Sequence, residues 1–367
     1  MGVLGRFFNR MRILAGGQIL EDIDMYNRVH ELFSNFSAED SRFNDYGEGF
    51  GNVWEGYADN IAVSDTYLKG IAGGSYQTVL FKPLSGILNQ RKYIPIRFMP
   101  ITIELSLVDD VNDPIISNVG NAGFTALNTS TTWQVVNVQA KCDLVTLDSG
   151  LNKSHIKLLE EGKKLTLNYN TFISHYQTIT NQTDFSINIT RSLTRLKSVF
   201  VSLWKDYAAA PRTTIVGSKN WNDFFSPAAY ETNGGVNTFN LDGEFEFHMQ
   251  IGSKLYPEYP IRSHQEAYYQ LRKTLGHQSS TVHNFTIKPF EYKSTKFVIG
   301  IDTEKVLEAG FTGLNTRSGD LLTVKFKYNK PAAGGNIDAR RVASLMHIVL
   351  HSDHILEIHD TCVRVFD

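Results

Sequence analysis

Residues 245–251 read FEFHMQI, an unbroken alternation of apolar and polar side chains. Successive side chains of a β-strand point to opposite faces, so the four apolar residues would share one face and the three polar residues the other. The stretch therefore predicts a strand with one face on a hydrophobic core. The same period recurs at 101–107, 185–190 and 324–328.

Strand signals of this kind recur along the whole chain. Aromatic residues make up 12% of it, with 23 Phe and 16 Tyr, which suits pleated, half-buried surfaces. Many short strands in two groups, with clusters of Gly, Asn, Asp or Pro between most of them, indicate an all-β fold of sandwiches or barrels. The further strands are expected at about 11–20, 76–88, 133–147, 164–179, 195–204, 284–301 and 344–366.

Length and charge limit the class of protein. A chain of 367 residues favours two domains, and 42% hydrophobic with 20% charged residues excludes disorder. The net charge is -2, from 36 basic and 38 acidic side chains, so no strong direct binding of nucleic acid is expected. No apolar run reaches the roughly 18 residues that span a bilayer, and no signal peptide is expected.

Only two cysteines occur, which excludes a disulfide framework. Cys142 and Cys362 lie in alternating apolar runs, where a free thiol packs as a small hydrophobic group. We therefore expect both to be buried, in a reducing compartment.

Three segments carry helical signals. Residues 22–36 place Ile23, Tyr26 and Val29 near one stripe. Residues 263–275 open with Ser263 and Glu266 at the spacing of a capping box, and 151–161 is followed by Gly162, which suits a helix C-terminus.

The two halves repeat one order of elements. Residues 12–20 form a strand that turns at glycine before a helix, and 247–251 does the same at Gly252. Each half also closes with a long β run, 133–147 and 346–365. The first unit has far fewer residues before its glycine turn than the second unit has. We therefore expect the first unit to lack its opening strands. Either the chain is an N-terminally incomplete form or another segment supplies them, and unpaired strand edges would result.

The densest cluster of chemistry-bearing residues is at 347–359. In a strand of period 2, His347 and His351 share a face while His354 lies on the other, so they would not ring one metal ion. Polar positions on an exposed or interface strand are the favoured interpretation, and no metal site is predicted. The cluster comprises His347, His351, His354 and His359 with Asp353 and Glu357.

Other patterns are weaker still. Residues 47–51 (GEGFG) lack the lysine and the strand-to-helix setting of a phosphate loop. No nucleophile elbow, catalytic cysteine motif or metal triad occurs, so no catalytic residue, cofactor or enzymatic activity is predicted.

Two basic segments remain. The basic, partly apolar residues 2–12 would suit a membrane-facing arm. The residues on and near 151–197 form a solvated face or contact an acidic partner or genome. These are Lys153, Lys157, Lys163, Lys164, Arg191, Arg195 and Lys197.

Six stretches follow one another in a recognisable order. They are 17–28 (GQILEDIDMYNR), 133–138 (WQVVNV), 191–200 (RSLTRLKSVF), 259–263 (YPIRS), 297–302 (FVIGID) and 312–316 (TGLNT). In this order the chain resembles the double jelly-roll major capsid proteins of polinton-like viruses, adintoviruses and their relatives. Members of that family usually begin with strands ahead of the GQIL segment, and this sequence departs from them there.

The resemblance implies two jelly-roll β-sandwiches with a few short helices. Residues 1–150 would form the first roll, incomplete at its N-terminus, 151–162 a linker helix, and 163–367 the second roll. It further implies homotrimers whose six rolls form a pseudo-hexagonal tile of an icosahedral shell around a DNA genome. The implied location is the virion, assembled inside the host cell. The implied partners are other copies of the chain, penton and minor capsid proteins and an internal membrane.

The loops at about 37–74, 109–131 and 206–240 are then candidates for trimer contacts and the outer surface. The alternative is a carbohydrate-binding, lectin-like β-sandwich, which the loop aromatics Trp54, Trp221 and Tyr230 favour. A jelly-roll enzyme of the cupin type would need a converging metal triad, so it ranks last.

Overall fold

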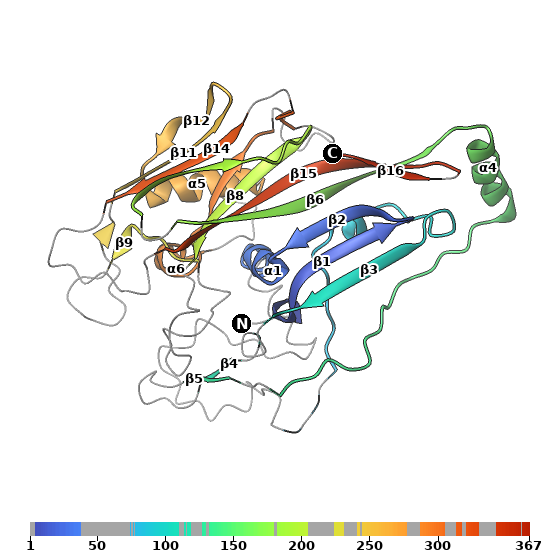
Figure 1. The fold of residues 1–367 in the computed structure, drawn as a ribbon, viewed down its shortest axis with the longest axis horizontal. Helices are drawn as coiled ribbons and strands as arrows, with labels where there is room; N and C mark the ends of the chain where they lie inside the picture. The colour runs from blue at the N-terminus through green and yellow to red at the C-terminus, as the bar shows by residue number, and fades with distance from the viewer. Residues whose placement is uncertain are drawn as a thin grey trace.

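The computed structural model describes residues 4–37, 74, 76, 78–109, 114, 116–118, 127–129, 132–179, 182–204, 224–230, 241–242, 244–276, 287–304, 313–317, 321–329, 343–360 and 362–367. They form three larger antiparallel sheets and a few short helices, which confirms the all-β fold class. Two small ladders pair β4 (Ile116–Asn118) with β5 (Leu127–Thr129) and β9 (Ala229–Tyr230) with β10 (Leu241–Asp242). In Figure 1 the long strands β6 (Leu165–Thr178) and β15 (Leu345–Ile358) cross the middle of the molecule.

The alternating stretch at 245–251 forms β11 (Phe245–Ile251), an inner strand of a four-stranded sheet with the order β12-β11-β14-β7. The other strands are β12 (Lys254–Ile261), β14 (Leu322–Tyr328) and β7 (Asp184–Ile189). Apolar positions of β11, β14 and β7 are buried and the residues between them are more exposed. The predicted strands at 185–190, 245–251 and 324–328 are therefore confirmed.

The second sheet is built around β15. Its order is β13-β8-β15-β16, and β6 pairs with β15 as well. Most residues of β8 and β15 are buried on both faces of the sheet, at odd- and even-numbered positions alike, because both faces of these strands are covered. The predicted run at 344–366 is two strands, since the chain reverses after Ile358. The remaining strands are β13 (Ile299–Asp302), β8 (Leu196–Trp204) and β16 (Val363–Phe366).

These two sheets form a sandwich in the second half. The ring of Phe297, which precedes β13, meets the ring of Phe245 edge-on at 5.8 Å between centroids. Helix α5 (His264–Thr274) follows β12, and α6 (Pro289–Ser294) leads into β13. Ser263 caps α5 by accepting a hydrogen bond from the Glu266 N–H at 3.2 Å, which confirms the predicted helix start.

The first half contains a three-stranded sheet with the order β2-β1-β3. The predicted strand at 11–20 is a hairpin, because Gly16 and Gly17 adopt positive φ values of 55° and 82° and reverse the chain. Helix α1 is shorter than the expected 22–36, because β2 continues to Asp24. The bounds are η1 (Leu4–Phe7), β1 (Phe8–Ala15), β2 (Gln18–Asp24), α1 (Tyr26–Ser34), α3 (Gly86–Asn89) and β3 (Ile101–Leu107).

Both halves thus share a hairpin followed by a helix. In the first half β1, β2 and α1 follow one another, and in the second half β11, β12 and α5 do so. The strand before the turn also pairs on its other side, β1 with β3 and β11 with β14. The repeat read from the sequence is therefore present, with an extra strand between the glycine turn and each helix.

The predicted helix at 151–161 is α4 (Ser149–Glu160), which is followed by Gly162 with a φ of 73°. It lies at one end of the molecule (Figure 1). The strand bounds and helices do not decide where one domain ends, so the division at 150 and 163 remains a prediction.

Three predicted strands are wrong. Residues 78–85 form no regular strand and lead into α3, while the described part of 284–301 contains α6 and only a short β13. Residues 133–147 form no helix or strand and pair with no described strand, and most of them are exposed. Alternation specifies two faces, whereas a strand also needs a neighbouring backbone. Cys142 and Cys362 are exposed, so the expected burial of both thiols is wrong too.

The two halves meet along β6. The Tyr169 hydroxyl on β6 donates to the Leu20 carbonyl at 2.7 Å, and the rings of Phe33 and Phe172 lie 4.5 Å apart. The backbone of Gly86 packs directly on the Asn170 carbonyl. Buried apolar residues of both halves consequently form one continuous cluster.

Glu21 on β2 holds α3 in this position. Its carboxylate accepts hydrogen bonds from the Gly86 N–H at 2.7 Å, the Ile87 N–H at 3.2 Å and the Ser85 hydroxyl. Glu21 is only 1% exposed, and burial raises its pKa to about 7 despite these hydrogen bonds.

Replacing Gly86 by alanine tests the contact between α3 and β6. A methyl group at position 86 would collide with the Asn170 carbonyl oxygen, so Gly86→Ala should lower the free energy of unfolding by about 2 kcal/mol. Urea denaturation measures this. Gly150→Ala, in the first turn of α4, is the matched control and should leave stability unchanged or slightly raised. Equal effects of the two changes would contradict the tight contact.

Glu21 makes stability depend on pH. Between pH 4.5 and about 7 the folded state keeps the Glu21 proton that the unfolded state has lost, so stability decreases as pH rises through this window. The full difference is about 3 kcal/mol. Glu21→Gln should flatten the decrease, which urea denaturation at pH 5 and pH 7.5 measures. Identical slopes for the two proteins would rule out Glu21 as the titrating group.

Candidate functional surfaces

His347 and His351 are embedded between β15 and its neighbours. A ring nitrogen of His347 shares a hydrogen bond with the Ser174 hydroxyl at 2.8 Å, and burial lowers its pKa well below the usual range. His351 shares one with the Ser198 hydroxyl at 3.2 Å and stacks on Phe172, and burial lowers its pKa to about 3. Both rings are therefore neutral packing groups at neutral pH.

His354 and His359 have different neighbours from those of His347 and His351. His354 meets the ring of Tyr169 edge-on at 5.7 Å, and burial lowers its pKa to about 4. His359 lies 3.4 Å from the Glu357 carboxylate near the end of β15. No three His, Cys, Asp or Glu side chains in the described part of the chain are grouped to hold a metal ion.

The basic residues near 151–197 are largely paired. Lys197 contacts Glu304 at 3.0 Å and Asp353 at 3.7 Å and is mostly buried. These pairs weaken the positive field that an acidic partner or a genome would need. The further ion pairs are Lys157–Glu161, Lys163–Glu161, Lys164–Glu357 and Arg191–Asp367.

The N-terminal residues do not form a membrane-facing arm over the part described, 4–12. Phe7, Phe8 and Met11 are buried in the core, and Arg6 forms an ion pair with Glu31 at 3.0 Å. The expectation of an exposed apolar arm is therefore wrong for these residues. None of the helices that the structure describes is long and apolar enough to cross a bilayer.

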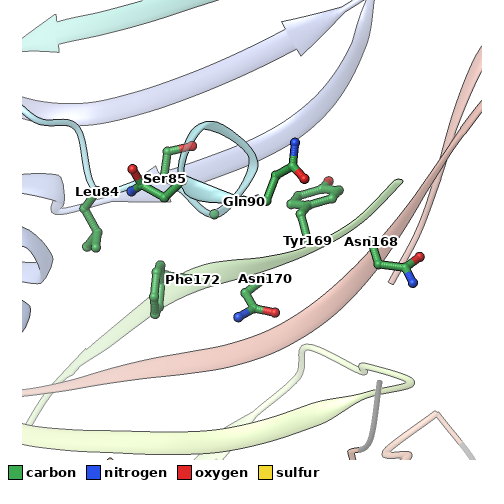
Figure 2. A pocket seen from close by; sticks show the side chains of 9 residues that line it. Leu84, Ser85, Gln90, Asn168, Tyr169, Asn170 and Phe172 are labelled. Carbon is green, nitrogen blue, oxygen red and sulfur yellow. The ribbon is translucent and has the colours of Figure 1, made fainter. Parts of the chain in front are cut away.

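A small pocket of about 280 Å³ lies between α3 and β6. Figure 2 shows Ser85 and Gln90 on the α3 side and Tyr169 of the strand extending toward Gln90. The described residues that line it offer amides, one serine hydroxyl and aromatic rings, without a carboxylate, imidazole, thiol or amine. Such a lining contains no base to activate a nucleophile.

Several predicted surfaces lie outside the described residues. These include the GEGFG stretch, Trp54, Trp221, the side chain of Tyr230 and most of the loops at 37–74, 109–131 and 206–240. The lectin-like alternative and the predicted trimer loops therefore remain predictions.

Exposed apolar residues at 136–144 and on β3 were not predicted as a surface. Val136, Val138 and Leu144 are 69%, 74% and 73% exposed in the irregular segment before α4. On β3, Ile103 and Leu107 are 42% and 49% exposed. The alternating pattern of both stretches was visible in the sequence, but it indicated buried strands.

Comparison with known proteins rests on structure. No protein-family model matches the chain, and no curated protein matches its sequence. A capsid model of the virus PBCV-1 superimposes with a TM-score of 0.54 at 10% identity, covering 98% of this chain and 83% of that one. PBCV-1 VP54, fitted into the virophage Sputnik, gives 0.56 at 11% identity, with coverages of 98% and 83%. The Faustovirus major capsid protein gives 0.53 at 10% identity, with 96% and 72%.

These likenesses extend over nearly the whole chain, so they include both halves. Identities of 10–11% establish the fold and not a shared activity. The chain has the double jelly-roll fold of viral major capsid proteins.

Proposed function

We propose that this protein is a viral major capsid protein that self-assembles as pseudo-hexameric homotrimers, which tile an icosahedral shell around a DNA genome. The observation that carries the proposal is the structural likeness to viral capsid proteins over 96–98% of the chain. A match of this extent covers both halves of the chain rather than a single β-sandwich.

The described surface agrees with a structural role. Three copies of a chain with two similar halves place six similar units around one axis, which suits hexagonal packing. A net charge of -2 for 367 residues limits repulsion between many copies in a shell. The buried, neutral histidines of β15 and the pocket without a base give no support to catalysis. A non-enzymatic role is therefore part of the proposal.

The proposal extends to location and partners. The protein would reside in the virion after assembly inside the host cell, in contact with neighbouring copies, penton and minor capsid proteins. An internal membrane is the remaining candidate partner. The paired lysines and arginines near 151–197 favour contacts with protein over direct contacts with the genome.

The mass of the purified protein tests self-assembly. We expect light scattering to give about 124 kDa, three times the 41.4 kDa of one chain. Electron microscopy of concentrated samples should show particles of hexagonal outline that pack side by side. A monomer at all concentrations, without hexagonal packing, would refute the capsid proposal.

A further inference from the structure

Residues 66–103 contain no aspartate or glutamate, although the whole chain carries 38 acidic side chains. The same stretch contains five basic residues, so it is positive within a chain whose net charge is -2. Basic side chains without acidic ones between them produce a local positive field that attracts anionic partners. The five are Lys69, Lys82, Arg91, Lys92 and Arg97.

Three of these cations lie on one surface loop. Residues 91–97, which we call the basic loop, lie between α3 and β3, and Arg91, Lys92 and Arg97 are exposed there. No carboxylate of the described residues forms an ion pair with any of the three. The guanidinium of Arg97 lies 5.9 Å from the centroid of the Phe98 ring, which does not neutralise its charge.

The acidic groups of the adjoining strands are engaged with other partners. Glu104 of β3 contacts Arg12 at 2.6 Å, and Asp22 of β2 contacts Arg10 at 2.6 Å. The basic loop therefore keeps a positive charge that the basic residues near 151–197 largely lose in ion pairs.

The core holds the basic loop in place. Ile94 and Phe98 pack against the buried cluster, and Met99 is fully buried. The N–H groups of Phe98 and Met99 both donate to the Pro95 carbonyl, at 3.0 and 3.2 Å. Because this turn fixes which side chains face inward, the remaining ones are presented to solvent in a defined arrangement.

Two apolar side chains project among the cations. Tyr93 is 76% exposed and Ile96 is 50% exposed. β3 begins at Ile101, opposite Ala15 at the end of β1, so the chain enters β3 at the end of the sheet where β1 turns into β2 (Figure 1). Ile19, which follows this turn, is 48% exposed. This end of the first-half sheet thus combines cations with exposed apolar groups.

The combination suits the surface of an anionic bilayer. Arginine and lysine bind lipid phosphates, tyrosine favours the headgroup region, and an aliphatic side chain enters the hydrocarbon boundary. Duplex nucleic acid offers phosphates but no apolar phase for Ile96. Free phosphate would occupy the cations and leave Tyr93 and Ile96 in water. Among these anions, the lipid surface is the one that uses both kinds of side chain.

We propose that the basic loop docks this protein on a bilayer that contains anionic lipid. Arg91, Lys92 and Arg97 bind headgroup phosphates, and Tyr93 and Ile96 enter the interface beside them. The inference deepens the proposed function and rests on it for the membrane itself, since an internal membrane is a candidate partner there. It assigns the membrane contact to a loop of the first half instead of the N-terminal residues.

Vesicle binding by the full-length protein tests the role of charge. The protein should sediment with vesicles of phosphatidylcholine and phosphatidylserine but not with phosphatidylcholine alone, and added salt should weaken binding. The triple variant Arg91→Gln, Lys92→Gln, Arg97→Gln should bind about 100-fold more weakly, since each basic group contributes about fivefold near an anionic surface.

A matched control removes the same charge from another surface. Lys254→Gln, Lys325→Gln and Lys327→Gln together change the four-stranded sheet of the second half and should leave vesicle binding nearly unchanged. Equal losses in the two triple variants would mean a response to net charge alone and would refute docking through the basic loop. Full binding by the loop variant would refute it as well.

A fluorescent probe tests insertion without removing a cation. In a background of Cys142→Ser and Cys362→Ser, Ile96→Cys labelled with a polarity-sensitive dye should brighten and shift to the blue when anionic vesicles are added. The same dye on Tyr259→Cys, an 82% exposed position of β12, is the control and should not respond. Equal responses at the two positions would contradict an oriented contact.

The remaining outcomes separate this inference from the capsid proposal. Trimers that do not bind anionic vesicles would refute the membrane contact and leave the proposed capsid trimer intact. Monomers that bind vesicles through the basic loop would do the reverse. Loss of trimers in the loop variant would assign the loop to a contact between copies. Displacement by free phosphate, or equal binding of duplex DNA that the loop variant loses, would assign it to phosphate groups and not to lipid.

Discussion

Strand β15 is hydrogen-bonded to β6 along its entire length and to β8 along its first half, so its backbone groups are satisfied deep inside the molecule. This pairing fixes β6 between the two halves. From β6, Tyr169 bonds to Leu20, Asn170 packs on Gly86, and Phe172 packs on Phe33. The position of the first-half sheet relative to the second-half sandwich therefore depends on the register of a strand near the C-terminus.

Polar groups in and beside this sheet serve packing. Ser174 and Ser198 each share a hydrogen bond with an imidazole of β15, and Glu21 binds three donors around α3. Burial keeps the two histidines uncharged, because a desolvated charge without a partner would cost several kcal/mol. Residue types that suggest chemistry in the sequence thus join neighbouring strands of one sheet or a strand to a short helix.

The first half differs from the second in what covers its sheet. Phe245, Phe297 and Phe326 close the sandwich of the second half, whereas Ile103 and Leu107 of the first half remain open to solvent. An exposed apolar sheet edge promotes aggregation of a monomer, whereas an assembly buries such an edge between its subunits. This contrast links the proposed function to a physical feature of the chain and not only to its likeness to capsid proteins.

Sequence periodicity by itself determined the fold class and the central strands. The alternation in 245–251, the capping pair Ser263 and Glu266, and Gly162 after α4 are local signals, and local signals specify local conformation. Only the tertiary structure decided that 133–147 pairs with no strand among the described residues, that Cys142 is exposed and that His347 is buried. Pairing and burial depend on which backbone and side chains arrive from distant parts of the chain, and a period of two residues carries no information about them.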